Sequence, residues 1–246
     1  MPRRLLRKFA YGGLIAVAMD AALIAVGAAT GTGAGTAIAA LTWHWPRDKL
    51  AVEGPGPASP GALRWLTIVA TGATIGTVSV LTASHTSGPG TSGLDGAVFG
   101  WMLLALLVLD VEHFWLPDRL TVPLAAMGLI AGLWWPPALI DRAIGAVAGF
   151  ASLAGIAYGY RAMTGRVGLG GGDPRLFAAI GAWLGWVALP FLLLAAAGLG
   201  LVLVGFDRLS GRTVTRHTRV PLGALLAASA WPLWLIASSQ GWGFGR

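Results

Sequence analysis

Two aspartates lie where the surrounding sequence is otherwise apolar or glycine-rich, and both are candidates for acid–base chemistry. Asp110 ends the uncharged stretch 96–109, and Asp173 directly follows three glycines at 170–172. A membrane crossing needs roughly 20 helical residues, so a helix that begins near residue 96 carries Asp110 to the boundary of a bilayer or into it. An ionisable group in that setting is costly and is a functional-site hypothesis by default. Two such carboxyl groups together predict general acid and general base catalysis.

Each aspartate also has a plainer interpretation. Asp110 could end its helix at the lipid headgroups, where a charge costs little. Asp173 precedes Pro174, and this order is typical of a helix N-cap followed by proline at the first helical position. The preceding glycines favour more than a cap, because a backbone without side chains can approach another chain or a substrate closely. A phosphate-binding loop is not favoured, since no Gly-Lys-Ser/Thr follows the glycines.

The sequence offers no ligand set for a metal ion or a cofactor. It contains no cysteine, and its four histidines do not have metal-binding spacing. Thiol nucleophiles and cysteine-based zinc modules are therefore excluded, and no motif frames a Ser/His/Asp triad. We expect neither a metal nor a cofactor.

The elements that must position the aspartates are membrane helices. The chain has 246 residues, of which 56% are hydrophobic and 11% charged, whereas about a quarter of the residues in a soluble domain are charged. Strand-like alternation is absent, so the predicted fold class is all-α, a polytopic membrane helical bundle. We expect about eight or nine transmembrane segments. The count is nine if residues 9–45 form a hairpin that bends at 31–33, and eight if they cross once.

The helix pattern divides the chain into an N-terminal membrane region, 1–95, and a region that carries both aspartates, 96–246. Helices are expected at 65–83, 96–111, 121–135 and 142–162, in the run 176–206 with a break near Pro190, and at 221–240. Polar or glycine-rich loops are expected at 46–64, 84–95, 112–120, 164–175 and 207–220. Glu112 and His113 therefore fall in a predicted loop, where solvated side chains are the rule.

The net charge of +7 indicates membrane topology, not nucleic-acid binding. If five basic segments share one side of the membrane, that side holds 15 of the 17 Lys and Arg residues; the segments are 3–8, 47–64, 119, 161–175 and 208–219. Such asymmetry is what the positive-inside rule expects of the cytoplasmic side. Membrane lipid is thus a predicted partner and nucleic acid is not. Both aspartates then lie at the cytoplasmic boundary.

Two segments resemble the type IV prepilin peptidases, which are membrane aspartic peptidases of the GxGD type. Residues 109–133, LDVEHFWLPDRLTVPLAAMGLIAGL, resemble the family's first motif, with Asp110, His113, Pro117 and Asp118 in their places. Residues 168–186, GLGGGDPRLFAAIGAWLGW, match the second, with Gly170, Gly172 and Asp173. The two aspartates are 63 positions apart, as in the family, and 220–223 resembles a later family segment. The likeness covers roughly residues 96–240.

The resemblance implies an aspartic endopeptidase that cleaves the leader of a type IV prepilin or pseudopilin at the cytoplasmic face of the cell membrane. Asp110 and Asp173 would be its catalytic pair. Many members also carry paired Cys-x-x-Cys motifs linked to N-methylation, but this chain has no cysteine and segment 46–64 is short. Methyltransferase activity is therefore not expected. Two alternatives remain open at this point, a proton-coupled transporter and a non-catalytic membrane subunit of a pilus or secretion apparatus. Neither the individual substrate nor the oligomeric state can be read from the sequence.

Overall fold

The protein is an all-helical bundle, as the apolar sequence predicts. The computed structural model describes residues 3–49, 61–85, 93–166, 168–211 and 220–239, with side chains omitted at 3–19, 45–49 and 83–85. The helices are α1 (Arg3–Lys49), α2 (Ala62–His85), α3 (Gly93–His113), α4 (Asp118–Ala131), α5 (Leu139–Thr164), α6 (Asp173–Leu184), α7 (Leu189–Leu209) and α8 (Leu222–Ser239), with a 3-10 turn at Trp186–Ala188. Most of the predicted loops 46–64, 84–95 and 207–220 lies outside the described residues.

Six of the described helices are long and apolar enough to cross a membrane, which makes this a multi-pass membrane protein. The other two, α4 and α6, have 14 and 12 residues. At 1.5 Å per residue they reach only about 21 and 18 Å, which is short of a bilayer core. The predicted count of eight or nine crossings is therefore not confirmed.

Helix α1 is continuous from Arg3 to Lys49, so of the two alternatives the hairpin with a bend at 31–33 is wrong. Its glycines serve packing instead. A side chain at Gly27 would meet the Thr77 Cα at 2.7 Å, and one at Gly35 would meet the Val69 Cα at 2.7 Å. Gly31 faces α2 in the same way, and this spacing of four lets the two backbones touch, as small residues do between membrane helices.

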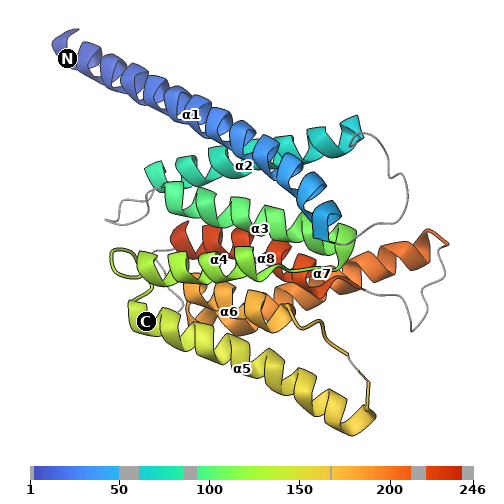
Figure 1. Cartoon of the computed structure of the whole chain (residues 1–246). Coiled ribbons are helices and arrows are strands. Elements are labelled where there is room, and N and C mark those ends of the chain that lie inside the picture. Colours follow the sequence, from blue (N-terminus) through green and yellow to red (C-terminus); the bar gives the residue numbers. More distant parts are fainter. Residues whose placement is uncertain (1–2, 50–60, 86–92, 167, 212–219, 240–246) are drawn as a thin grey trace.

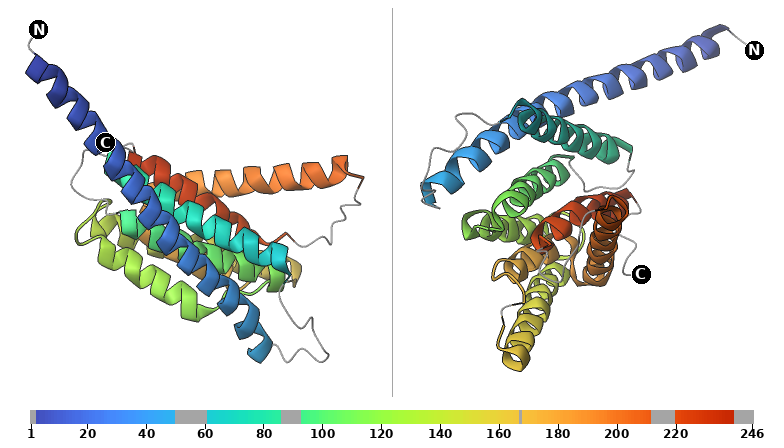
Figure 2. Two further views of the ribbon diagram at one scale, coloured as in Figure 1. Left: turned by 90° about the horizontal axis from the view of Figure 1, so that it is seen from above. Right: turned by 90° about the vertical axis from the view of Figure 1, so that its right-hand side faces the viewer.

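The continuous α1 also corrects the predicted distribution of basic residues. Figure 1 shows α1 beginning at one end of the bundle, whereas α3 ends and α6 begins at the opposite end. Segment 3–8 is therefore separated from the other basic segments, because no hairpin returns the chain. In Figure 2, α1 lies along one side of the bundle, against α2, and its first turns extend beyond the other helices.

The break in the run 176–206 lies at 185–188, just before Pro190, as predicted. Gly185 has φ 76°, which ends α6, and Pro190 occupies the first turn of α7. Helices α3, α6 and α8 form the centre of the main hydrophobic core. Within it, the rings of Phe99 and Trp183 stack at 4.8 Å, and the Trp183 indole N–H donates to the Leu124 carbonyl of α4 at 2.8 Å. These contacts hold α4 and α6, which are too short to span, against α3.

Arg142 fixes the turn between α4 and α5 at the end of the bundle away from the aspartates. Arg142 is 1% exposed, and among the described residues its guanidinium donates to five backbone carbonyls, those of Gly128, Trp135, Pro136, Pro137 and Ala182. The Pro136–Pro137 peptide in this turn is cis. Because the carbonyls satisfy its donors, a buried arginine is tolerated here as a structural residue.

Candidate active site

Asp110 lies in the last turn of α3 and is only 5% exposed. The helix ends three residues later, where Phe114 adopts the left-handed conformation with φ 50° and donates its N–H to the Asp110 carbonyl at 2.9 Å. A bulky residue with positive φ is uncommon and marks a sharp change of chain direction. The chain then reaches extended Pro117, which precedes α4. The uncharged stretch before Asp110 thus positions this carboxylate as predicted, at a helix end and buried.

Asp173 is the first residue of α6 and is 7% exposed. The plainer interpretation, in which Asp173 caps this helix, is wrong, because Gly172 occupies the N-cap position and no side chain caps the helix. The Asp173 Oδ2 atom instead accepts a hydrogen bond from the Gly170 N–H at 3.1 Å. The carboxylate therefore turns back over the glycine loop, away from the helix that it begins.

The start of α8 brings the two aspartates together. The Ala224 N–H donates a 2.7 Å hydrogen bond to Oδ2 of Asp110. The backbone N–H of Gly223, one residue earlier, interacts with both carboxylates. The first N–H groups of a helix have no partner within it and carry its positive dipole end, so they favour a nearby anion. Asp110 and Asp173 thus meet at this helix terminus.

Leu116 packs against two glycines at this meeting point. A side chain at Gly172 would lie 2.7 Å from the Leu116 Cβ, and one at Gly223 would lie 2.7 Å from the Leu116 Cδ1. A Cβ atom at Gly223 would also lie only 2.9 Å from Oδ2 of Asp110. Leu116 is 8% exposed. The three segments that form the site can therefore pack this closely only because glycine occupies both positions.

Burial and the second carboxylate both act on Asp173. Desolvation is the larger cause and the negative charge of Asp110 the second, and together they raise the pKa of Asp173 to about 6. The hydrogen bond from Gly170 opposes this increase. Two carboxyl groups that share a site cannot both ionise cheaply, so one of them holds a proton at a pH where an isolated aspartate would not. The geometry and the charge coupling together support acid–base chemistry by the pair.

Two predicted motif residues, Pro117 and Asp118, lie beside the pair and do not join it. Pro117 precedes α4. Asp118 begins α4 and accepts from a single nitrogen of Arg175, Nη1, with 2.6 and 2.8 Å to its two oxygens. Both side chains of this ion pair are about half exposed. The contact joins the segment that follows Asp110 to the first turn of α6.

The sequence predicted a loop at Glu112 and His113, but the structure places both residues in the last turn of α3. Glu112 pairs with Arg64 of α2 at 2.6 Å, and the imidazole of His113 lies 3.8 Å from Glu112. Nothing in the local sequence indicated that an arginine 48 positions earlier would pair with Glu112.

The described residues contain no cluster of three His, Asp or Glu side chains that could hold a metal ion. A cavity of about 240 Å³ lies between α2, α3 and α8, with Thr74, Leu107 and Trp231 in its lining. Neither aspartate lines this cavity, which is apolar apart from a few hydroxyl and indole groups. The cavity is thus distinct from the carboxylate pair.

The fold and the site define a polytopic membrane protein with two buried carboxylates at a helix terminus. Residues 97–205 match the model of the type IV leader peptidase family, which confirms the resemblance seen in the sequence. The matched range contains both aspartates. It does not contain the start of α8, where the carboxylates meet.

Several curated relatives carry the name prepilin leader peptidase/N-methyltransferase. That of Aeromonas hydrophila is 33% identical over 198 residues, which is 78% of this chain and 63% of the relative. That of Dichelobacter nodosus is 36% identical over 170 residues, 68% of this chain and 57% of the relative. That of Pseudomonas aeruginosa is 39% identical over 132 residues, 53% of this chain and 45% of the relative. The chain thus spans about half to two thirds of the length of these relatives, and no solved structure matches it.

Three contributors to the site could not be found by sequence reasoning. The Ala224 N–H is a backbone group, and no side-chain pattern marks it. Leu116 is one leucine among many. Arg64 lies near the boundary of a predicted loop, 48 positions before its partner Glu112. Gly223 did carry a signal, as the last residue of the segment 220–223, but that segment alone does not indicate contact with Asp110.

Proposed function

We propose that this protein is an aspartic endopeptidase that cleaves the leader peptide of type IV prepilins or pseudopilins. One observation carries the proposal: two buried aspartates from separate motifs converge on the start of α8, and the charge of one raises the pKa of the other. The match of residues 97–205 to the family and the names of the relatives support the same substrate class. We place the protein in the cell membrane with this site facing the cytoplasm, where the expected basic loops 161–175 and 208–219 lie.

The pair would hydrolyse the peptide by shared acid–base catalysis. One ionised aspartate removes a proton from water, and the resulting hydroxide adds to the scissile carbonyl carbon. The protonated aspartate donates to the carbonyl oxygen, and the C–N bond then breaks as the leaving amine takes up a proton. We assign the protonated role to Asp173, because its pKa of about 6 lets it retain a proton under mildly acidic conditions in which an ordinary aspartate is ionised. Asp110 is then the base. No metal takes part in this scheme.

Processing of a co-expressed prepilin tests the proposal. Wild type should convert the prepilin to the shorter mature form, seen as a gel shift, while Asp110→Asn and Asp173→Asn should each abolish conversion. Asp141→Asn is the matched control, because Asp141 lies in the first turn of α5 at the other end of the bundle, where it accepts from Trp186. Unchanged processing in either of the first two variants would contradict the catalytic pair. Uptake of a solute without any cleavage would favour the transporter alternative.

A further inference from the structure

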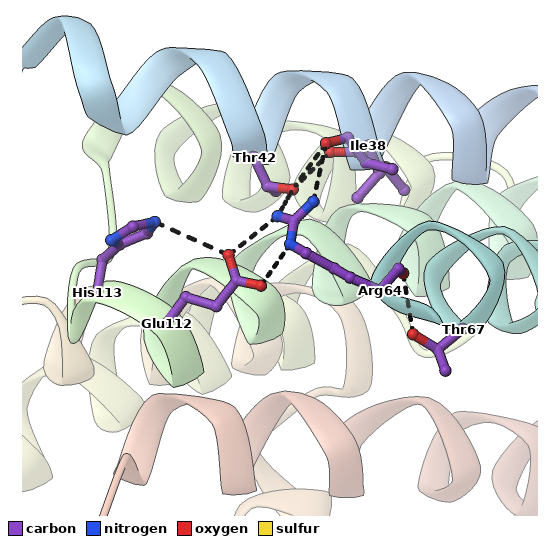
Figure 3. Close-up of polar contacts among 7 residues, drawn as sticks. Ile38, Thr42, Arg64, Thr67, Glu112 and His113 are labelled. Atoms are coloured by element: carbon purple, nitrogen blue, oxygen red, sulfur yellow. Dashed lines mark hydrogen bonds and ion pairs between the residues drawn. The ribbon is translucent and has the colours of Figure 1, made fainter. Parts of the chain in front are cut away.

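Arg64 reaches from α2 to the end of the helix that carries Asp110. It lies in the first turn of α2, outside the range 97–205 that matches the family. Its Nε and Nη2 atoms donate to the two oxygens of Glu112 at 2.6 and 2.9 Å (Figure 3). This fork uses two nitrogens for two oxygens, which is the strong bidentate form of an arginine–carboxylate pair.

The remaining donors of Arg64 bind α1. Nη2 also donates to the Thr42 hydroxyl at 2.8 Å, and Nη1 donates to the Ala39 carbonyl at 3.2 Å. The guanidinium carbon lies 5.6 Å from the centre of the Trp43 ring, within the range of a cation–π contact. The side chain is only 17% exposed. A single partly buried guanidinium therefore joins α1, α2 and α3.

Glu112 transmits this restraint to the carboxylate pair. It is two residues after Asp110, in the same final turn of α3, and the helix stops at His113. The last carbonyls of a helix lack intrahelical partners, so a terminal turn frays unless other groups hold it. The Arg64 fork holds this turn in place from the outside, while the Ala224 N–H holds the Asp110 carboxylate from the inside.

We propose that Arg64 is a positioning residue for Asp110 and acts through Glu112. The α1–α2 pair, although outside the family match, then contributes to turnover by fixing the angle at which Asp110 faces Asp173. Catalysis is sensitive to such placement, since a displacement of about 1 Å can cost on the order of 100-fold in rate. The inference rests on the proposed peptidase function of the same site.

Steady-state cleavage of a purified prepilin by the full chain in lipid nanodiscs tests the inference. We expect Arg64→Ala to lower kcat about tenfold and to change KM less than twofold, because substrate contacts remain while the geometry of the pair loosens. Arg64→Lys should lower kcat by a smaller factor, since an ammonium cannot form the two-nitrogen fork. The exchanged variant Arg64→Glu with Glu112→Arg should recover most of the kcat lost in Arg64→Glu alone.

Arg161→Ala is the matched control. Arg161 is an exposed arginine in the last turn of α5, and the described structure shows no ion pair at its side chain. Its removal should leave kcat and KM unchanged.

The possible failures can be told apart. If wild type cleaves and Asp110→Asn does not, but Arg64→Ala, Arg64→Glu and Glu112→Gln all keep the wild-type kcat, the positioning role is overturned and the peptidase proposal stands. An increase in KM at constant kcat would also overturn it, because that result assigns Arg64 to substrate binding. If wild type cleaves no prepilin, both proposals fail together.

Discussion

The Ala224 N–H donates a 2.7 Å hydrogen bond to the Asp110 carboxylate across 114 positions of sequence. Asp110 thereby satisfies one of the free N–H groups at the start of α8, as a capping side chain of the helix itself would do. The first turn of α8 is consequently a third component of the site, beside the two aspartate segments. The distance between Asp110 and Asp173 depends on how closely α8 approaches, and that approach depends on Gly223.

Gly223→Ala should impair cleavage without unfolding the bundle. The added methyl group would lie 2.9 Å from Oδ2 of Asp110 and 2.7 Å from the Leu116 Cδ1, so α8 must move away from Asp110. Overpacking of this kind costs about 1–3 kcal/mol. We expect at least a tenfold loss of prepilin cleavage, measured as an initial rate. Gly205→Ala is the control, because open space surrounds that position in α7, and a wild-type rate in Gly223→Ala would show that the close approach is dispensable.

Adjacent glycines in the loop before Asp173 should differ sharply in their tolerance of alanine. At Gly172 the methyl group would lie 2.7 Å from the Leu116 Cβ, which cannot swing away as a side-chain tip can. At Gly171 nothing lies within 4 Å, and the residue does not have positive φ. Cleavage should therefore fall about tenfold or more in Gly172→Ala and stay within twofold of wild type in Gly171→Ala. Equal rates in the two variants would mean that the loop does not use this contact.

The sequence predicts the two aspartates of this site but not the groups that contact them, and this difference has a physical reason. Asp110 and Asp173 stand out because an apolar run and a glycine run precede them, and both features are local. The all-helical bundle follows equally from the long uncharged runs. The donors from α8 and the Arg64 fork were not predictable, because each depends on a contact between residues distant in sequence. Local pattern also offers Asp173 as a helix cap, whereas tertiary packing turns its carboxylate to Gly170.

The glycines at 27, 31 and 35 show the same limitation at the level of a whole helix. Each glycine weakens an isolated helix by roughly 1 kcal/mol relative to alanine. A bend at this point was therefore a reasonable expectation. In the structure the same residues allow α1 to lie directly on α2 through Gly72 and Gly76. Packing against a partner helix thus outweighs local propensity, and only the partner's position could have revealed it.

Arg175 should accept replacement by lysine, in contrast to Arg64. It contacts both oxygens of Asp118 through one nitrogen, a geometry that an ammonium group can reproduce. Both side chains are about half exposed, and exposed pairs of this kind contribute only about 0–1 kcal/mol. We expect Arg175→Lys to keep cleavage within twofold of wild type and Arg175→Ala to reduce it about two- to fivefold. A loss in Arg175→Lys as large as that in Arg64→Lys would show that the number of nitrogens in the contact does not matter.

The raised pKa of Asp173 predicts how stability depends on pH. Burial and the Asp110 charge favour the neutral form in the folded protein, with a pKa of about 6, whereas the unfolded chain has the ordinary value of 3.8. Between these values the folded state binds more protons than the unfolded state, so this group lowers stability as pH rises from about 4 to about 6. The penalty is complete above pH 6 and absent below pH 4.

Asp173→Asn removes that penalty, so the variant should have a higher Tm than wild type at pH 7 and an equal Tm near pH 4. Thermal unfolding in nanodiscs, followed by tryptophan fluorescence across this range, measures the difference. Asp110→Asn separates the two causes of the raised pKa of Asp173. It removes the charge of Asp110 but leaves the larger effect of burial. The pH-dependent penalty at Asp173 should therefore become smaller without vanishing. A Tm difference between Asp173→Asn and wild type that does not change with pH would contradict the proposed protonation of Asp173.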